Sequence, residues 1–404
     1  MNKPELLAPA GNLEKLETAI DFGADAVYLG GSKLNLRAFA DNFSNEELKE
    51  GIEYAHQRGR RVYVTLNVFP HNEDLYGIED YLKELESSKV DAIIVSDPGI
   101  IAISKEVVPN LEIHLSTQAN TVNWKSAEFW YKQGIKRVVM ARELSLNDIK
   151  EIRAKLPKDF EIEAFIHGSM CMSYSGRCVL SNYMTGRDSN RGQCAQPCRY
   201  KYFLMEEKRP GEYFYILEDD KGTYILNSKD LCMIEHIPEL VESGIDSFKI
   251  EGRMKSSYYV ACVVKAYRQA IDAYFEQGKE YKYKSEWMDN LLMASHRKYF
   301  TGFYFNDKDS LIFENSSYIR DYDIVGIVKE YNNGRAIVEQ RNKLYDGDKV
   351  QVLRPIGDNF SVVVNDMRNS DGEKIDAAPV AQMIFSFLTD TSLEKGDMLI
   401  KEKK

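Results

Sequence analysis

The sequence predicts an α/β fold: a TIM-like (β/α)8 barrel with a cysteine-rich insertion after strand seven, followed by a small C-terminal β-barrel. Eight short apolar segments alternate with amphipathic helical segments over the first two-thirds of the chain. The first seven start 20 to 35 residues apart, and the eighth starts 86 residues after the seventh. A doubly wound open sheet is the alternative, because periodicity alone cannot show that a sheet closes.

The strands and helices follow from local patterns. Ser44 with Glu47 three residues on predicts a capped helix start, Ser145 opens another helix, and Gly23 ends the first one. A long helix is expected from about residue 256 to 277. The expected strands are Glu5–Ala8, Ala26–Leu29, Arg61–Val68, Ala92–Val95, Glu112–Ser116, Arg137–Ala141, Glu161–Ile166 and Ser247–Ile250.

These elements predict two domains. The barrel is expected over residues 1–310, with the insertion at about 168–245, on the face where such barrels keep their active sites. Residues 320–404 are expected to form the small β-barrel, since turn residues separate short alternating segments there. Its expected strands are Val325–Val328, Ala336–Val338, Lys349–Leu353, Phe360–Val364 and Met383–Phe387.

Charge and hydropathy limit the function. The formal net charge of −10 argues against a protein that coats nucleic acid, such as DNA, by bulk electrostatics. The stretch from Arg177 to Arg209 is nonetheless about +4 and is either a local RNA-facing loop or a solvated surface. Because no apolar run is long enough for a bilayer span or a secretory signal, we expect a cytoplasmic protein that does not enter a membrane.

Four of the six cysteines are clustered. Cys171, Cys178, Cys194 and Cys198 have the spacing C-x6-C-x15-C-x3-C. Thiolates suit iron–sulfur clusters or zinc, and the wide first pair favours a cluster over a zinc knuckle, with free thiols as a third reading. Cys232 and Cys262 lie in apparent helical patterns, so we expect them to be small buried residues.

Polar residues gather where the barrel strands are expected to end. Arg253 is a candidate bidentate anchor for a carboxylate or phosphate, or else forms a structural salt bridge with Glu251 or Glu143. His167 is a candidate for proton transfer, although a lone histidine is often structural. The candidate catalytic residues are His167, Glu251 and Arg253, and the candidate substrate-binding residues are Asn67, Gln118, Asn120, Arg142, Arg177 and Arg199.

Several segments together resemble the signature of the U32 peptidase family, the collagenase-like proteins. The resemblance covers nearly the whole chain, and Arg209–Tyr213 is most similar to the tRNA-hydroxylating branch. We find no H-E-x-x-H, G-x-S-x-G, Walker or G-x-G-x-x-G motif. The matching segments are Glu5–Gly11, Glu163–Ser181 around Cys171 and Cys178, Gly192–Tyr200 around Cys194 and Cys198, Leu226–Leu231 and Ser247–Arg253.

This resemblance implies formation of 5-hydroxyuridine at the wobble position of tRNA. It also implies a 4Fe-4S cluster on Cys171, Cys178, Cys194 and Cys198, with Cys232 as a minority fourth ligand. Prephenate is implied as co-substrate, with oxygen from a source other than O2, and Arg253 or Arg142 is our candidate for its carboxylate. A second family member is a candidate heteromeric partner.

Three functional readings stay open at this point. The first is the tRNA hydroxylase, or a sibling that hydroxylates ribosomal RNA. The second is a peptidase, as the family name suggests. The third is a non-catalytic partner whose cluster is structural. For an RNA enzyme, an unstacked base needs stacking partners, for which Tyr174, Tyr183 and Tyr200 are candidates.

Overall fold

Eight parallel strands close into a barrel in the computed structural model, which describes residues 2–34, 42–170, 176, 178–199, 207–211, 229–305 and 318–403. The strands pair from β1 through β7 in order, and β9 pairs with both β7 and β1. This double pairing closes the sheet, so the (β/α)8 prediction is confirmed. The strands are β1 (Glu5–Pro9), β2 (Ala26–Leu29), β3 (Arg61–Leu66), β4 (Ala92–Val95), β5 (Glu112–Leu115), β6 (Arg137–Val139), β7 (Glu161–Ser169) and β9 (Ser247–Ile250).

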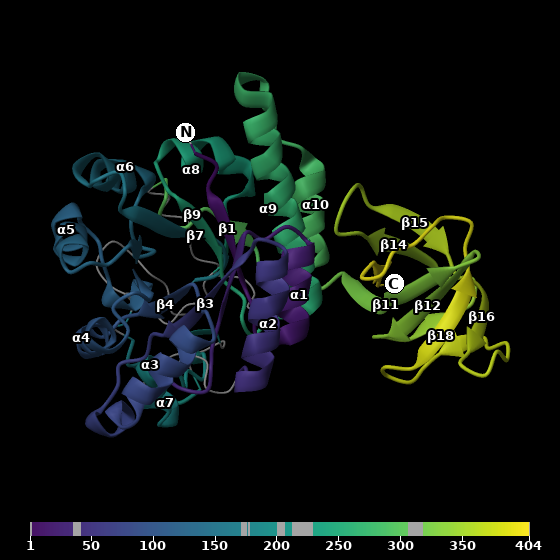
Figure 1. Ribbon diagram of the computed structural model, residues 1–404. Coiled ribbons are helices and arrows are strands. Elements are labelled where there is room, and N and C mark those ends of the chain that lie inside the picture. The colour runs from purple at the N-terminus through teal and green to yellow at the C-terminus, as the bar shows by residue number, and fades with distance from the viewer. Residues whose placement is uncertain are drawn as a thin grey trace.

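A helix follows every barrel strand, and Figure 1 shows these helices around the outside of the strands. Several begin where the sequence predicts. Ser44 and Glu47 form a full capping box, and Ser145 and Ser256 cap their helices through their side chains. The helices are α1 (Leu13–Asp21), α2 (Asn45–Gln57), α3 (Ile78–Ser87), α4 (Pro98–Val107), α5 (Trp124–Lys132), α6 (Leu146–Lys155), α8 (Ile237–Glu242) and α9 (Ser257–Gln277), with α10 (Ser285–Met293) packed on α9.

Alternation along the strands fills both sides of the barrel wall. One set of residues packs inside the barrel, while their neighbours pack outward against the helices, as a two-residue period requires. The lower interior is charged: Arg137 contacts Glu5 and Glu163, and Lys249 contacts Glu163. The inward apolar cluster is Leu7, Ala26, Tyr28, Tyr63, Ala92 and Ile94, and the outward set includes Leu6, Val27, Val62 and Ile93.

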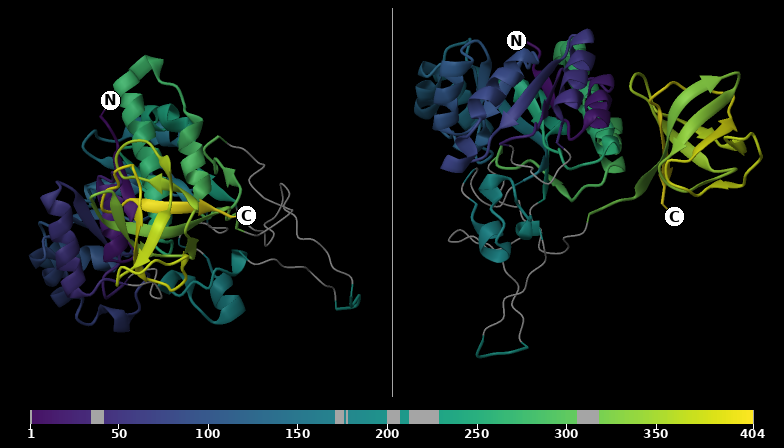
Figure 2. Two further views of the ribbon diagram at one scale, coloured as in Figure 1. Left: turned by 90° about the vertical axis from the view of Figure 1, so that its right-hand side faces the viewer. Right: turned by 60° about the horizontal axis from the view of Figure 1, so that its bottom comes forward.

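The cysteine-bearing insertion leaves the barrel through a narrow neck. Strand β7 pairs with the short antiparallel strand β8 (Asp230–Cys232), so residues 170–229 depart and return at adjacent points. Strand β10 (Tyr299–Phe300) runs parallel to β8 on its other side. Within the insertion the structure describes α7 (Leu180–Thr185) and two short 3-10 turns, η3 (Ser189–Arg191) and η4 (Pro197–Arg199), and Figure 2 shows these below the barrel.

One sequence expectation needs correction here. The helix expected around Cys232 is wrong. This residue lies in strand β8, which pairs with the edge of β7 and so joins the sheet. Its expected burial is confirmed, and Cys262 is fully buried in α9.

The C-terminal residues form a curled antiparallel sheet with its own core. Phe385 and Phe387 are fully buried there, and Leu353, Met398 and Ile400 join the main core against the barrel. The described pairings leave β15 and β16 as edges, so the expected small β-barrel is a half-barrel. The strands are β11 (Tyr322–Asn332), β12 (Arg335–Gln340), β14 (Lys349–Leu353), β15 (Phe360–Val363), β16 (Asn365–Asn369), β18 (Ile384–Leu388) and β19 (Met398–Glu402), and β13 (Leu344–Tyr345) pairs with β17 (Ala377–Ala378).

Among the described residues, no helix is both long enough and apolar enough to cross a bilayer.

Candidate functional site at the mouth of the barrel

Arg253 lies at the carboxyl end of β9 and joins three parts of the barrel mouth. Its side chain is only 4% exposed. One terminal nitrogen donates to Thr65 Oγ1 at 3.1 Å, and the other donates to Asn42 Oδ1 at 3.1 Å. Because a guanidinium is planar and permanently charged, these two contacts fix the plane in which it presents positive charge to the mouth.

Glu251 lies next to this arginine along the chain. The hydroxyl of Tyr28 lies 3.1 Å from Glu251 Oε2 and 3.0 Å from the carbonyl of Ile250. The Tyr259 hydroxyl donates to the carbonyl of Glu251 at 2.9 Å. Tyr28 therefore orients the carboxylate from inside the barrel, and Tyr259 of α9 holds the backbone of Glu251 in place.

Three amide side chains follow strands β3 and β5 at the same end of the barrel. Asn67, Gln118 and Asn120 are all half-buried. Asn120 has a left-handed backbone (φ 53°), which asparagine tolerates better than most residues. Its Oδ1 is buried and has no hydrogen-bond partner in the structure. A buried acceptor of this kind is suited to an N–H group of a ligand.

Arg142 reaches the mouth from the loop after β6. Its guanidinium carbon lies 3.9 Å from the centre of the Phe165 ring, so the side chain stacks on an aromatic residue of β7. Lys249 approaches the same ring at 5.6 Å. Phe165 thus brings two cations close together just below the mouth.

A buried ion network underlies the mouth. Glu163 accepts from Lys249 Nζ at 2.7 Å and from Arg137 at 3.2 Å. Burial by itself would raise the pKa of Glu163, but the charges of Lys249 and Arg137 outweigh it and lower that pKa. This network satisfies its own charges, so it forms a rigid floor rather than an open binding site.

The insertion lies against this mouth. The backbone N–H of Phe69, after β3, donates to the carbonyl of Asn190 at 3.1 Å. A Cβ on Gly176 would lie 2.2 Å from the carbonyl oxygen of Gln118, and this glycine has φ +74°, so only glycine fits. Gly176, which lies between Cys171 and Cys178 in the chain, therefore packs against the loop that carries Gln118, a predicted substrate-binding residue.

Three of the four clustered cysteines lie in the described part of the insertion. Cys178, Cys194 and Cys198 are half-buried and are not in disulfides, whereas Cys171 lies outside the described residues. The backbone N–H of Gln196 donates to Cys194 Sγ at 3.4 Å, from a left-handed residue with φ 57°. In the part of the chain that the structure describes, no three His, Cys, Asp or Glu residues are gathered to hold a metal.

The predicted basic loop is only partly available for a ligand. Arg191 donates to Asp74 at 2.8 Å and to Glu73 at 3.3 Å, so it fastens the insertion to the loop after β3. Arg187 donates to the carbonyl of Gln193. Arg177 lies outside the described residues, and the side chain of Arg199 is not among those described. Of the candidate stacking residues, Tyr183 is 89% exposed on α7, and Tyr174 and Tyr200 lie outside the described residues.

His167 lies apart from the mouth. The pairing of β7 with β9 shifts between Phe165 and His167, and this irregularity places His167 beside Ile250. The imidazole then faces Tyr259 and Tyr267 of α9, on the outer side of the barrel wall. A one-residue shift reverses the face of a strand, so His167 points outward. The expected position of His167 at the mouth is therefore wrong.

Three residues of the mouth escaped the sequence analysis. Thr65 and Tyr28 face inward along β3 and β2, and alternation within those strands could have identified them. Asn42 meets Arg253 from 211 positions away, and no local pattern signals that contact.

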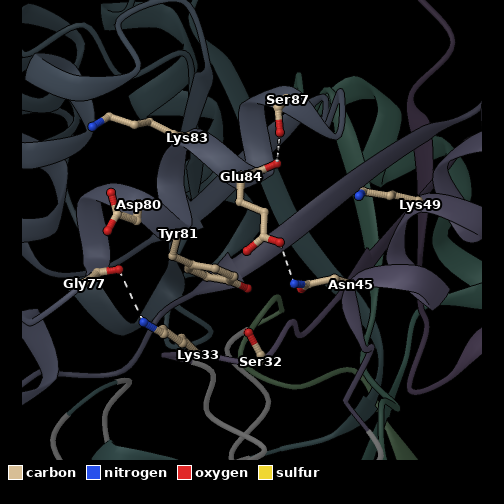
Figure 3. A pocket seen from close by; sticks show the side chains of 10 residues that line it. All are labelled: Ser32, Lys33, Asn45, Lys49, Gly77, Asp80, Tyr81, Lys83, Glu84 and Ser87. Carbon is tan, nitrogen blue, oxygen red and sulfur yellow. Dashed lines mark hydrogen bonds between the residues drawn. The ribbon is translucent and has the colours of Figure 1, made fainter.

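A separate groove of about 770 Å³ lies on the side wall between α2 and α3 (Figure 3). Lys33 Nζ donates to the carbonyl of Gly77 at 3.3 Å, and Asn45 donates to Glu84 at 2.5 Å. Its lining mixes lysines with Asp80 and Glu84, and it includes none of the predicted site residues. We therefore place the candidate site at the mouth and not in this groove.

The chain resembles known proteins along nearly all of its length. It is 45% identical to tRNA hydroxylation protein P1 of Bacillus subtilis, over 99% of this chain and 95% of that protein. It is 38% identical to tRNA hydroxylation protein P of Escherichia coli, over 94% and 92%. It is also 46% identical to an uncharacterized protease of Methanocaldococcus jannaschii, over 81% and 78%.

Two family models match in succession. The model described as peptidase family U32 matches residues 11–312, and the model of the U32 C-terminal domain matches residues 320–399. The first alone covers well over half of the sequence, and it contains the mouth, the neck and the cysteine-bearing insertion. This chain therefore belongs to peptidase family U32.

Proposed function

We propose that this protein is a tRNA-modifying enzyme that forms 5-hydroxyuridine at the wobble position, with an iron–sulfur cluster and prephenate and without O2. The observation that carries the proposal is the alignment, over more than nine-tenths of both chains, with two proteins named for tRNA hydroxylation. The mouth supports it, because cations and amide groups converge there beside the cysteines.

The cations of the mouth suit an anionic co-substrate. Prephenate carries carboxylates, and a planar guanidinium binds a carboxylate through two parallel hydrogen bonds. Arg253 is oriented by Thr65 and Asn42, and Arg142 by Phe165. We assign the carboxylate to Arg253, with Arg142 as the second cation.

The amides suit the base. A uracil ring has one N–H donor and two carbonyl acceptors, and reading it requires the base to leave its stack. Asn120 offers a buried Oδ1 acceptor without a partner in the structure, and Asn67 and Gln118 lie at the ends of nearby strands. We assign the uracil N–H to Asn120.

The cysteines suit a 4Fe-4S cluster by their chemistry. Cys178, Cys194 and Cys198 are not in disulfides, and the backbone N–H of Gln196 donates to Cys194 Sγ. Cys171 is assigned as the fourth ligand from the family motif. When bound, such a cluster supplies or accepts single electrons beside the mouth.

The peptidase reading is second, supported by the family name and by one relative named as a protease. Nucleophilic proteases use a histidine that is hydrogen-bonded to a Ser, Thr or Cys side chain. All six histidines are described, and within the described part of the chain their rings bond to carboxylates, a carbonyl, Arg191 and Tyr267. We therefore rank peptide hydrolysis below RNA hydroxylation.

The test uses the purified chain without air, given unmodified tRNA with or without prephenate. We expect nucleosides from the prephenate reaction to contain 5-hydroxyuridine, identified by mass spectrometry. Parallel reactions contain ribosomal RNA and a denatured collagen substrate. Hydroxycytidine in the ribosomal RNA, or peptide cleavage with unaltered tRNA, would overturn the assignment. Activity that requires a second family member would support the heteromeric partner.

A further inference from the structure

The neck of the insertion contains a cluster of buried polar side chains that is separate from the mouth. In the antiparallel pair of β7 and β8, His167 lies opposite Cys232 and Ser169 lies opposite Asp230. Opposite residues share a face of a sheet, and so do residues two apart on one strand. His167 and Asp230 therefore lie on one face as diagonal neighbours, for which the typical separation is about 7 to 8 Å and the Cβ atoms are somewhat closer.

The ring of His167 is packed among aromatic side chains, and one of its two nitrogens lacks a hydrogen-bond partner in the structure. Its ring is 1% exposed and lies 5.3 to 6.0 Å, between ring centres, from Tyr299, Tyr267 and Tyr259. Nδ1 lies 3.4 Å from the Tyr267 hydroxyl. Nε2 is buried and has no hydrogen-bond partner in the structure.

Asp230 is in a complementary position. It is 3% exposed, and its Oδ2 accepts the backbone N–H of Arg297 at 3.1 Å. Its Oδ1 is buried and, like His167 Nε2, has no hydrogen-bond partner in the structure. A buried polar atom without a partner costs on the order of 1 to 3 kcal/mol, so two on one face indicate a shared occupant.

A single water molecule meets the needs of both atoms. Buried waters make roughly three hydrogen bonds to polar atoms that would otherwise lack a partner. The two atoms do not bond each other directly, and both side chains lie on the same face of the β7–β8 pair, so one oxygen between them would satisfy both. The neck is also where the insertion, residues 170–229, leaves and rejoins the barrel.

We propose that one buried water bridges His167 Nε2 and Asp230 Oδ1, and that this bridge makes Asp230 a positioning residue for His167 and for the neck. The insertion is thereby held at a fixed angle over the mouth. This inference deepens the proposed function, because the insertion carries the cysteines assigned to the cluster. It does not depend on which RNA is modified.

The electrostatics agree with this arrangement. Burial lowers the pKa of His167 to about 3, which outweighs the opposing effect of Asp230. The other titratable groups around the ring are Lys255, His296, Cys232 and the tyrosines 259, 267 and 299. The imidazole is thus neutral at working pH and offers one donor and one acceptor.

The first test is a spectroscopic one on the full chain. Nitrogen-15 spectra of the histidine rings are recorded from about pH 5 to 8, for the wild type and for Asp230→Asn. We expect His167 to stay neutral throughout in the wild type, and its two nitrogen signals to shift when Asp230 is replaced. His114, a buried histidine at the other end of the barrel, is the internal control and keeps its signals.

Unchanged His167 signals in Asp230→Asn, or a His167 that titrates near the ordinary value of about 6.5, would overturn the bridge. A double-mutant cycle on the thermal midpoint supplies a second readout. His167→Gln and Asp230→Asn each lower the midpoint, and the double variant falls no further than the larger single loss. Additive losses would show that the two residues act independently.

The positioning role is tested by protease cleavage within residues 170–229. We expect about tenfold faster cleavage in Asp230→Asn and His167→Gln than in wild type or His114→Gln, and equal rates would contradict the role. If Asp230→Asn fails to fold, His167→Gln and Asp230→Glu carry the same comparisons. A wild-type chain that binds no iron would remove the cluster proposal. The histidine spectra, the double-mutant cycle and the cleavage rates would still show whether the bridge in the neck exists.

Discussion

At the scale of single residues, Arg253 contributes most to the mouth. It is buried, permanently charged, and bonded to Thr65 and Asn42 from two other barrel segments. A buried charge is retained only where its geometry is satisfied, and the same geometry presents its positive charge for recognition. The proposed role of Arg253 as a carboxylate anchor therefore depends on Thr65 and Asn42, which orient its side chain.

We expect Arg253→Lys to lower kcat/KM for prephenate at least tenfold, because lysine cannot reproduce the planar pair of hydrogen bonds. A tenfold loss corresponds to about 1.4 kcal/mol. The assay is the anaerobic tRNA reaction at varied prephenate. Arg58→Lys, on the surface of α2's C-terminal end, serves as the control and should leave kcat/KM unchanged. Full activity in Arg253→Ala would remove this residue as the anchor.

Two buried histidines predict how stability depends on pH. Burial lowers the pKa of His114 and of His167 to about 3, compared with about 6.5 in an unfolded chain. Between these values the unfolded chain binds more protons, so the free energy of unfolding decreases as pH falls below about 6.5. The limiting slope is roughly 1.4 kcal/mol per pH unit for each histidine.

Urea unfolding at a series of pH values measures this slope. We expect His114→Gln to flatten it between about pH 6 and 4. Tyr63→Phe removes a hydroxyl that bonds Glu5 beside the same ring, so it lowers stability but keeps the slope. A slope that is identical in wild type and His114→Gln would refute the assignment.

At the scale of elements, the neck fixes where the cysteine-bearing insertion leaves and rejoins the barrel. Cys178, Cys194 and Cys198 lie between β7 and β8, two strands that pair with each other and return the chain to the barrel. Arg191 and Asn190 fasten the insertion to the loop after β3. The cysteines are thereby kept beside the mouth although they are part of no barrel strand.

We expect the wild-type chain, purified without air, to contain about four irons and to absorb broadly in the visible range, as iron–sulfur proteins do. Cys194→Ala should lose most of this iron because it removes one ligand. Cys262→Ala is the matched control, since its thiol is fully buried in α9, and it should retain the iron. Cys232→Ser decides whether the buried neck cysteine takes part. Zinc in place of iron would contradict the cluster.

At the scale of the whole molecule, the half-barrel is joined to the barrel through a buried lysine. Lys265 on α9 is 2% exposed and donates to the carbonyl of Arg354 at 2.7 Å and to Asn359 Oδ1 at 2.6 Å. Asn359 in turn donates to Asn290 of α10 at 2.7 Å. Apolar residues of the half-barrel join the same core, so the two domains share a packed seam.

We expect Lys265→Met to weaken this seam by roughly 2 to 3 kcal/mol, since hydrogen bonds to a charged group are lost and their acceptors stay buried. Calorimetry should then resolve two unfolding transitions in place of one. Lys284→Met, at the rim of the same seam, should leave the trace unchanged. A single transition at the wild-type temperature in Lys265→Met would show that apolar packing alone joins the domains.

Much of the architecture follows from local sequence. Eight strands of the correct type, the capped starts of α2 and α6, and the position of the insertion all depend on periodicity and on short-range hydrogen bonds. The cysteine spacing and the family motifs also depend on neighbouring residues. In the half-barrel the weak two-residue pattern was less informative, and β16 and β19 were missed.

The sequence by itself thus determined the number of barrel strands, the position of the insertion and the resemblance to a family, because each is set by residues close together in the chain. Tertiary structure alone decided that β9 closes on β7, that Asn42 and Thr65 orient Arg253, and that His167 faces α9 instead of the mouth. The reason is physical. Closure and long-range contacts join residues about 80 to 210 positions apart, and a single register shift reverses the face of a strand, so neither leaves a local signal.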